Sequence, residues 1–226
     1  MAILKIKQSL IKTIIFDFDG TLAKLNIDFQ EMREAIVKLI LSCGITENEL
    51  HTDFVLEMID SAEAILMQRS ERRAKYFIDT ANSIIEEIEI QAANNGELFD
   101  GTKKLLKSLE TQEIFCGIIT RNCAKAIEIV FPDILSYCPV VVCRDDVKKV
   151  KPHPEHLNTA LNKLGISAEY ALMIGDHPLD IKAGRNSGTN TCGVLTGHFQ
   201  KKYFIEAGAD LVLPQAADIL NIINSH

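Results

Sequence analysis

Two acidic residues follow a short apolar run near the start of the chain. The run Ile14-Ile15-Phe16 leads directly into Asp17-Phe18-Asp19-Gly20-Thr21. Asp17 and Asp19 lie two positions apart, and in an extended backbone such residues point to the same side. Ligands of open α/β sheets bind beyond the carboxyl ends of the strands, so both carboxylates lie where a site is expected. The alternative is a polar turn in which one Asp accepts hydrogen bonds from backbone amides.

A second and a third segment add hydrogen-bond donors. The apolar run Ile118-Ile119 leads into Thr120-Arg121-Asn122, and Lys151 stands directly before Pro152. The Thr hydroxyl and the Asn amide can donate to a phosphoryl oxygen, as can the backbone amides that open the next helix. A helix cap is the other interpretation of the Thr and Asn. A single lysine in an acidic site would balance carboxylates and a phosphate.

The fourth segment supplies two more carboxylates. Met173-Ile174 leads into Gly175-Asp176, and Asp180 lies four residues further on. Taken together, the four segments place Asp, Thr, Lys and Asp side chains at the carboxyl ends of four predicted strands. Oxygen-rich carboxylate clusters suit Mg²⁺, whereas zinc prefers Cys and His ligands.

Strand-like and helix-like segments alternate over most of the chain. Short apolar runs bounded by turn residues predict strands at 13–16, 114–120, 139–143, 170–174, 191–195 and 211–213. Helical patterns lie between them at 101–110, 123–130, 154–164, 178–187, 201–207 and 215–223. This alternation predicts an α/β fold with a doubly wound, Rossmann-like parallel sheet.

Residues 24–95 break this alternation. They contain no strand candidate and predict helices at 29–43, 47–68 and 71–93. Asn94-Asn95-Gly96 is a plausible return hinge. We therefore predict an α/β core domain made of residues 1–23 and 96–226, and an inserted helical domain made of residues 24–95.

Composition narrows the possible partners and location. The chain has 226 residues, 47% of them hydrophobic, and a formal net charge of −7. An acidic chain without Trp is a poor partner for nucleic acid. No membrane span or signal peptide is recognisable. The six cysteines form no CxxC pair or zinc-like cluster and are expected to be buried in a reducing, cytoplasmic environment.

In order and wording, the four segments resemble the motifs of the haloacid dehalogenase-like (HAD) hydrolase superfamily, over almost the whole chain. The motifs are Asp17-x-Asp19-x-Thr21, Thr120, Lys151 and Gly175-Asp176-x-x-x-Asp180. The helical insert resembles the helical cap of the phosphoglycolate phosphatase-like group. Two short sequences also resemble that group, namely Lys-Pro-x-Pro around Lys151 and Gly-Val-Leu-Thr-Gly at 193–197. His177 departs from the pattern, because many relatives carry Ser or Thr there.

The resemblance implies a Mg²⁺-dependent phosphatase acting on a small phosphorylated metabolite. Asp17 would attack phosphorus and form an aspartyl-phosphate, while Asp19 would act as general acid and then general base. Mg²⁺ would bind Asp17, the backbone carbonyl of Asp19 and Asp176. The resemblance also implies a group of side chains that bind the phosphoryl oxygens: Thr120, Arg121, Asn122 and Lys151. Asp180 would orient Lys151 or metal-bound water, and Thr21 would contact the residues that bind the metal.

Several alternatives remain open at this point. A sugar phosphomutase would use the same residues, and a 2-haloacid dehalogenase would need neither Mg²⁺ nor Asp19. A non-catalytic binding protein of the same fold is disfavoured, because every motif residue is present. Phosphoglycolate is the substrate of the relatives, while pyrophosphate, nucleotides and sugar phosphates are also compatible. A monomer and a homodimer both fit the sequence, and His177 is either a site contact or an ordinary loop residue.

Overall fold

The chain divides into two compact units. The computed structural model describes residues 4–6, 9–46, 49–50, 52 and 54–223. One unit comprises the residues up to Leu25 together with those from Gly96 onward, and the other comprises Asn26–Asn95. The first is an α/β unit, and the regular elements among the described residues of the second are helices.

A parallel sheet of six strands forms the centre of the α/β unit. In spatial order the strands are β10 (Leu211–Leu213), β9 (Asn190–Val194), β8 (Ala171–Gly175), β3 (Thr13–Phe16), β6 (Phe115–Ile119) and β7 (Val140–Val142). Every neighbouring pair is parallel. From β3 the chain builds outward to β7, then returns to the other side of β3 for β8, β9 and β10. This arrangement confirms the predicted doubly wound α/β fold.

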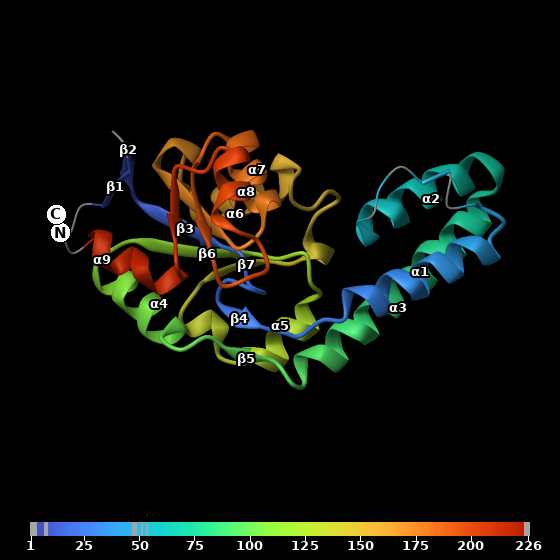
Figure 1. Cartoon of the computed structure of the whole chain (residues 1–226), viewed down its shortest axis with the longest axis horizontal. Coiled ribbons are helices and arrows are strands. Elements are labelled where there is room, and N and C mark those ends of the chain that lie inside the picture. Colours follow the sequence, from blue (N-terminus) through green and yellow to red (C-terminus); the bar gives the residue numbers. More distant parts are fainter. Residues whose placement is uncertain (1–3, 7–8, 47–48, 51, 53, 224–226) are drawn as a thin grey trace. The chain divides into compact units, whose positions relative to one another are not determined.

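Helices cover both faces of this sheet (Figure 1). One face carries α6 (Pro154–Leu164), α7 (Pro178–Ser187) and α8 (Lys201–Glu206), and the other carries α4 (Thr102–Thr111), α5 (Ala124–Val130) and α9 (Ile219–Ile223). Because the sheet is covered on both sides, strands β3 and β8 are buried at every position. The predicted helix at 215–223 is interrupted, since Ala216–Asp218 form a 3₁₀ turn before α9.

Proline and glycine explain why α6 and α7 match their predicted bounds. Each helix has a proline at its first position, where the missing N–H costs no hydrogen bond. Each ends at a glycine in the left-handed conformation, Gly165 with φ 67° and Gly188 with φ 79°. The turns that precede α6 and α7 therefore lead into helices whose first residue is set by a proline.

The helical unit consists of α1 (Phe29–Ser42), α2 (Val55–Arg69) and α3 (Glu71–Ala93). Its core is made of residues that recur at helical spacing, among them Ile36, Ile40, Met58, Leu66, Phe77, Ala81 and Ile85. The predicted start of the second helix, at residue 47, lies outside the described residues. The described residues before Val55 are not in α2, and the Thr52 hydroxyl there accepts a hydrogen bond from Phe54 N at 3.2 Å. Such local bonding competes with helix formation.

Four short strands were not predicted. β1 (Leu4–Ile6) pairs with β2 (Ser9–Ile11), and β4 (Ala23–Lys24) pairs with β5 (Glu97–Leu98), both antiparallel. Lys24 corrects the expectation that residues 24–95 contain no strand. Two- and three-residue strands are too short to produce a readable alternation of apolar and polar residues.

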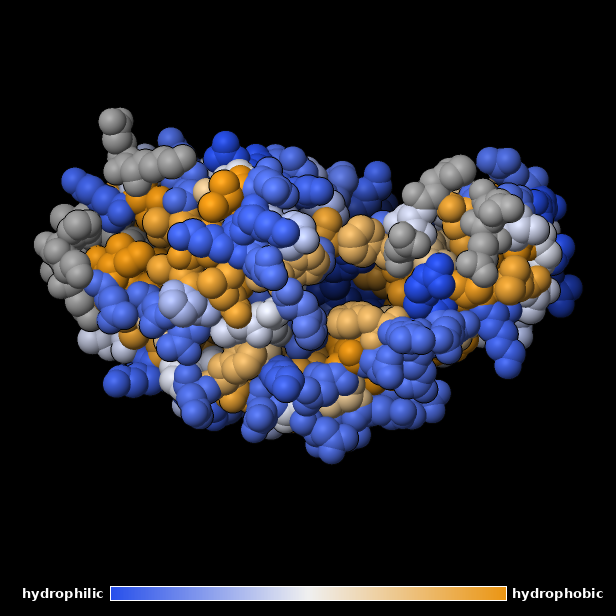
Figure 2. All heavy atoms as spheres, in the orientation of Figure 1, coloured by the Kyte–Doolittle hydropathy of each residue, from blue (hydrophilic) through white to orange (hydrophobic). Residues whose placement is uncertain are grey.

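The surface and the cysteines fit the composition. Hydrophilic residues are spread over the visible face of each unit, with apolar residues between them (Figure 2). All six cysteines are free thiols, and all except the half-buried Cys43 are buried. Burial raises the pKa of Cys138, Cys143 and Cys192 to about 12 in each case. Within the described residues, none of the helices combines the length and the apolar character that crossing a membrane requires.

The helical unit has its own core, so a cavity there should be costly. Phe77 is fully buried, whereas its neighbour Tyr76 is 70% exposed. We expect Phe77→Ala to lower the free energy of unfolding by about 3–5 kcal/mol, and Tyr76→Ala to change it by less than about 0.5 kcal/mol. Urea unfolding followed by circular dichroism would measure both. Equal effects of the two variants would contradict this description of the core.

Candidate active site

The acidic residues meet where two neighbouring strands end. β3 pairs with β8 so that Phe16 lies opposite Ile174, and Asp17 N donates to the carbonyl of Ile174 at 2.8 Å. The ladder therefore continues one residue beyond β3. Asp176 follows β8 directly, next to this point. The strand order reverses between β3 and β8. Open α/β sheets bind ligands at such a topological switch point.

Lys151 joins two of the carboxylates. Its Nζ lies 2.6 Å from Asp17 Oδ1 and 2.7 Å from Asp180 Oδ1. The side chains of Lys151, Asp17 and Asp180 are only 3%, 10% and 1% exposed. Burial alone would lower the pKa of Lys151, but the carboxylates of Asp17 and Asp180 outweigh it and raise that pKa. The lysine is therefore charged and uses two of its three N–H donors here.

Carboxyl groups outnumber basic groups in this cluster. One carboxylate oxygen each from Asp17, Asp176 and Asp180 lie within 4.8 Å of one another. Burial raises the pKa of Asp17 to about 7, with Lys151 opposing the rise and Asp180 adding to it. Burial, followed by Asp17 and Asp180, raises the pKa of Asp176 to about 9. Three carboxylates facing one ammonium repel one another unless further positive charge is supplied.

The oxygens of Asp180 already have partners. Oδ1 accepts from Lys151, and Oδ2 accepts from His177 N at 3.0 Å. The second bond is part of a capping box at the start of α7, in which His177 Nδ1 accepts from Leu179 N at 3.0 Å. Asp180 is thus held by the helix start and aimed at Lys151, which leaves Asp17 and Asp176 as the better candidates for binding a cation.

Three glycines make room for the carboxylates. A Cβ atom at Gly197 would lie 2.0 Å from Asp176 Oδ2, and one at Gly20 would lie 2.3 Å from the same oxygen. A Cβ atom at Gly175 would lie 2.1 Å from Asp180 Oδ2. Any side chain at these positions would displace a carboxylate. Gly20 also has φ +80°, which L side chains rarely adopt.

The second motif lies at the end of the neighbouring strand β6. Thr120 is 1% exposed, its N–H donates to Val142 O at 3.0 Å, and its Oγ1 accepts from Asn122 N at 3.2 Å. Asn122 is 7% exposed, and its buried Nδ2 atom has no hydrogen-bond partner in the described part of the chain. Arg121 Nη1 donates to the carbonyl of Lys151 at 3.4 Å. An unsatisfied buried donor costs free energy, which a bound acceptor would recover.

Asp19 and Thr21 continue the turn after Asp17. Asp19 Oδ1 accepts from Leu25 N at 2.8 Å, and Asp19 is outside the group of three close carboxylates. Thr21 Oγ1 donates to Asp176 Oδ1 at 3.4 Å. The loop after β9 fixes the same turn, because the Thr196 hydroxyl donates to the carbonyl of Gly20.

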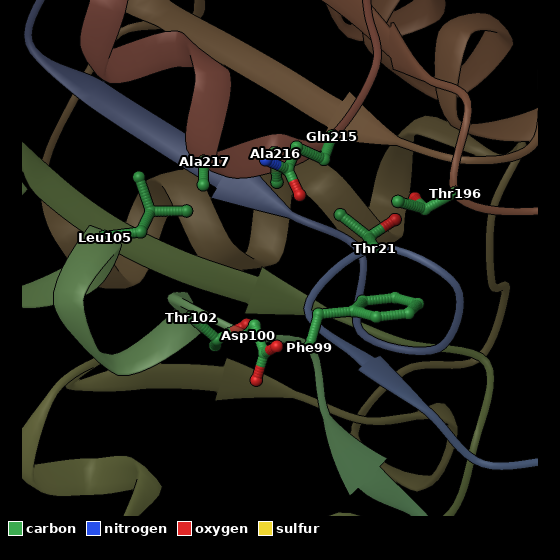
Figure 3. A pocket seen from close by; sticks show the side chains of 9 residues that line it. All are labelled: Thr21, Phe99, Asp100, Thr102, Leu105, Thr196, Gln215, Ala216 and Ala217. Atoms are coloured by element: carbon green, nitrogen blue, oxygen red, sulfur yellow. The ribbon is translucent and has the colours of Figure 1, made fainter.

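A small cavity lies behind this turn. Its volume is about 10 Å³, which is room for at most about one water molecule. Figure 3 shows Thr21 and Thr196 at one side of it and Phe99, Asp100 and Thr102 at another. It is too small to hold a substrate.

Sequence reasoning missed two kinds of residue here. The first kind is Gly197 and Thr196, whose loop resembled the phosphoglycolate phosphatase-like group in sequence but gave no reason to expect contacts with Asp176 or Gly20. His156, which contacts the main chain of Lys151, gave no signal at all, because a single histidine in a helix has no distinguishing pattern. Of the predicted residues, the structure brings Asp17, Lys151, Asp176 and Asp180 together and places Thr120 and Asn122 at the end of the adjacent strand.

A family model for haloacid dehalogenase-like hydrolases matches residues 14–194, a span that contains all four motifs. The chain belongs to the haloacid dehalogenase-like hydrolases. This confirms the family predicted from the motifs and shows that the protein is an enzyme that performs hydrolysis. The cluster around Lys151 is therefore the candidate active site of a HAD-like hydrolase.

Relatives and solved structures resemble the chain over most of its length. Pyrophosphatase PpaX of Bacillus cereus (strain AH820) is 29% identical over 219 residues, covering 95% of this chain and 97% of the relative. A predicted phosphoglycolate phosphatase from Haemophilus somnus 129pt matches with TM-score 0.63 and 21% identity, covering 94% of this chain and 97% of its own. CbbY from Rhodobacter sphaeroides, in complex with phosphate, matches with TM-score 0.64 and 19% identity, covering 95% and 99%. Both structures share the fold.

The glycine contacts predict a sharp effect on activity. Gly197→Ala should displace the Asp176 carboxylate and reduce the hydrolysis of an aryl phosphate by about 100-fold or more, because small misplacements in a site are costly. Gly188→Ala is the matched control: its left-handed backbone should cost about 1–2 kcal/mol of stability, but its Cβ would meet nothing within 4 Å. Steady-state kinetics and thermal unfolding separate the two effects. Wild-type activity in Gly197→Ala would refute the proposed crowding.

Proposed function

We propose that the protein is a Mg²⁺-dependent phosphatase that hydrolyses a small phosphorylated substrate through an aspartyl-phosphate on Asp17. The observation that carries this proposal is the cluster of three buried or partly buried carboxyl groups around a single lysine at Asp17. A nucleophilic carboxylate must approach a phosphoryl group that is itself negative, so the site needs more positive charge than Lys151 provides.

The residues fit a magnesium ion. The close donor atoms are carboxylate oxygens only, which suit a hard cation such as Mg²⁺ and do not suit zinc. Asp17 and Asp176 would hold the ion together with the backbone carbonyl of Asp19. Gly20 and Gly197 leave the space that the Asp176 carboxylate occupies. When bound, Mg²⁺ would offset the repulsion between the phosphoryl group and the carboxylates.

The second motif supports a phosphoryl site beside Asp17. The unpartnered Asn122 Nδ2 is a buried donor that a phosphoryl oxygen would satisfy. The Thr120 hydroxyl is buried at the end of the strand adjacent to β3 and can donate as well. The third N–H of Lys151 is a further donor, and we assign Arg121 to the same phosphoryl-binding group. These donors would fix the orientation of the group before attack.

Asp17 and Asp19 would divide the chemistry between them. An Asp17 oxygen attacks phosphorus, the bond to the leaving oxygen breaks, and Asp19 gives that oxygen its proton. Asp19 then removes a proton from water, which attacks phosphorus and breaks the bond to Asp17, releasing inorganic phosphate. Asp180 keeps the Lys151 ammonium beside Asp17, and Thr21 supports Asp176 from behind.

The helical unit would act as the cap, which limits access of water and selects the leaving group. The chain leaves the α/β unit after Leu25 and returns at Gly96, next to the paired strands β4 and β5. The amide of Leu25 donates to Asp19, so the proposed acid–base residue is bonded to the last residue before the insert. The sequence prediction of a core made of residues 1–23 and 96–226 with a cap of residues 24–95 stays a proposal, and the compact helical unit begins two residues later, at Asn26.

The resemblance and the relatives name the substrates to test first. Phosphoglycolate is what the family resemblance implies, and the Bacillus cereus relative is a pyrophosphatase. A panel of phosphorylated metabolites, assayed with and without Mg²⁺, would identify the substrate. Release of inorganic phosphate would support the proposal. Formation of an isomerised sugar phosphate would indicate a phosphomutase instead, and activity that survives EDTA would favour a dehalogenase. Buried free thiols favour a reducing, cytoplasmic location.

Removing the nucleophile tests the mechanism directly. Asp17→Asn should lower the hydrolysis of an aryl phosphate by at least about 1,000-fold, because the amide is a poor nucleophile. Its unfolding midpoint should stay near that of the wild type, since the change preserves shape. Asp28→Asn, at the exposed start of α1, is the control and should retain full activity, because Asn caps a helix as well as Asp. Wild-type turnover by Asp17→Asn would refute the assignment.

Metal binding can be tested without activity. Mg²⁺ at about 100 times its Kd should stabilise the wild-type protein by about 2.7 kcal/mol, measured as a shift in thermal unfolding. Asp176→Asn should lose most of this shift, whereas Asp28→Asn should keep it. EDTA should abolish both the shift and the activity of the wild type. An equal Mg²⁺ shift in Asp176→Asn would place the ion elsewhere.

A further inference from the structure

A buried histidine contacts the main chain of Lys151. His156 is in the first turn of α6 and is fully buried, with 0% of its surface exposed. Its Nδ1 accepts a hydrogen bond from the backbone N–H of Lys151 at 3.2 Å. Its Nε2 lies 3.0 Å from the carbonyl of Val142 at the end of β7. The ring therefore connects the main chain of Lys151 to the sheet.

These two partners fix the chemical form of the ring. A backbone N–H can only donate and a carbonyl can only accept, so Nδ1 is unprotonated and Nε2 carries the proton. A second proton on Nδ1 would face the N–H of Lys151. Burial, assisted by the nearby Lys151 charge, lowers the pKa of His156 to about 4, so the ring is neutral near pH 7. A neutral ring can lie close to the Lys151 ammonium without repelling it.

The carbonyl of Val142 is shared between two parts of the site. It accepts the N–H of Thr120 at 3.0 Å as well as the bond from His156. The carbonyl oxygen of Val142 on β7 therefore holds the main chain of Thr120 directly and the main chain of Lys151 through the ring of His156. A second contact, from Arg121 Nη1 to Lys151 O at 3.4 Å, holds the other side of the same peptide segment.

We propose that His156 is a positioning residue for the reaction, which holds the Lys151 main chain at the end of β7 and so sets where the ammonium lies between Asp17 and Asp180. This inference rests on the proposed function, because it gives Lys151 a part in catalysis. The Lys151 side chain is long and has many rotamers, so its Nζ can bridge two carboxylates reproducibly only if its backbone is fixed.

The two nitrogen atoms of the ring can be tested separately. In His156→Asn the side-chain oxygen takes the place of Nδ1 and keeps the bond from Lys151 N. In His156→Gln the side-chain amide takes the place of Nε2 and keeps the bond to Val142, while Lys151 N loses its acceptor. We expect kcat for an aryl phosphate to fall by about 10- to 100-fold in the Gln variant and by less than about 3-fold in the Asn variant. KM should change by less than about 3-fold in both.

His153 provides the matched control in the same segment. It is exposed, and its Nδ1 accepts a hydrogen bond from Glu155 N at 3.2 Å. His153→Gln should leave kcat within about 2-fold of the wild type. If His156 were only part of the core, activity would follow stability, and the Asn and Gln variants would lose activity in proportion to their unfolding midpoints. That result, or wild-type kcat in the Gln variant, would overturn the proposal.

A measurement without turnover separates this inference from the proposed function. Hydrogen exchange at the Lys151 amide should be slow in the wild type and in His156→Asn, and much faster in His156→Gln. Equal protection in all three proteins would overturn the positioning role. An inactive wild type, or a fully active Asp17→Asn, would instead refute the proposed function, and the exchange experiment would still show whether His156 holds Lys151.

Discussion

The ammonium of Lys151 bridges Asp17 and Asp180 at a place that water hardly reaches. Removing each of these charges from water costs several kcal/mol, and attraction between them offsets that cost only with good geometry. Apolar side chains of similar size would stabilise the fold as well or better. The bridge is therefore better explained by the role proposed for Asp17 than by stability, and the neighbouring elements keep it in place.

Each partner of the bridge is held by a different rigid element. Asp17 extends the β3–β8 ladder by one residue through its bond to Ile174, and Asp180 is fixed by the capping box of α7. Thr120 extends the β6–β7 ladder in the same way, through Val142. Residues that continue a ladder inherit the precision of the sheet, even though they lie in loops. This explains how side chains from distant segments are held in fixed positions relative to one another.

Much of the fold could be predicted from the sequence, because the relevant signals are local. Apolar runs flanked by turn residues define the six strands, and Pro at the start with Gly at the end defines α6 and α7. The acidic residues of the site were predictable because they follow those strands directly. The family match confirms the HAD-like assignment that the four motifs predicted.

The remaining features depend on tertiary contacts that leave no local pattern. His156 differs from any other helical histidine only through its contacts with Lys151 and Val142. Gly197 is an ordinary loop glycine until Asp176 lies against it. The paired strands β4 and β5 are two residues each, and their pairing joins positions that the whole helical insert separates along the chain. Short strands of this kind gain their order from the partner and not from their own sequence.

That pairing also has an evolutionary consequence. Ala23 lies opposite Leu98 and Lys24 opposite Glu97, so the two ends of the insert are tied together within the α/β unit itself. Whatever stands between them can grow, shrink or be exchanged without altering the register of the central sheet. If the helical unit is the cap proposed above, the stretch of the gene that encodes it can diverge while the stretches encoding Asp17, Lys151, Asp176 and Asp180 stay unchanged.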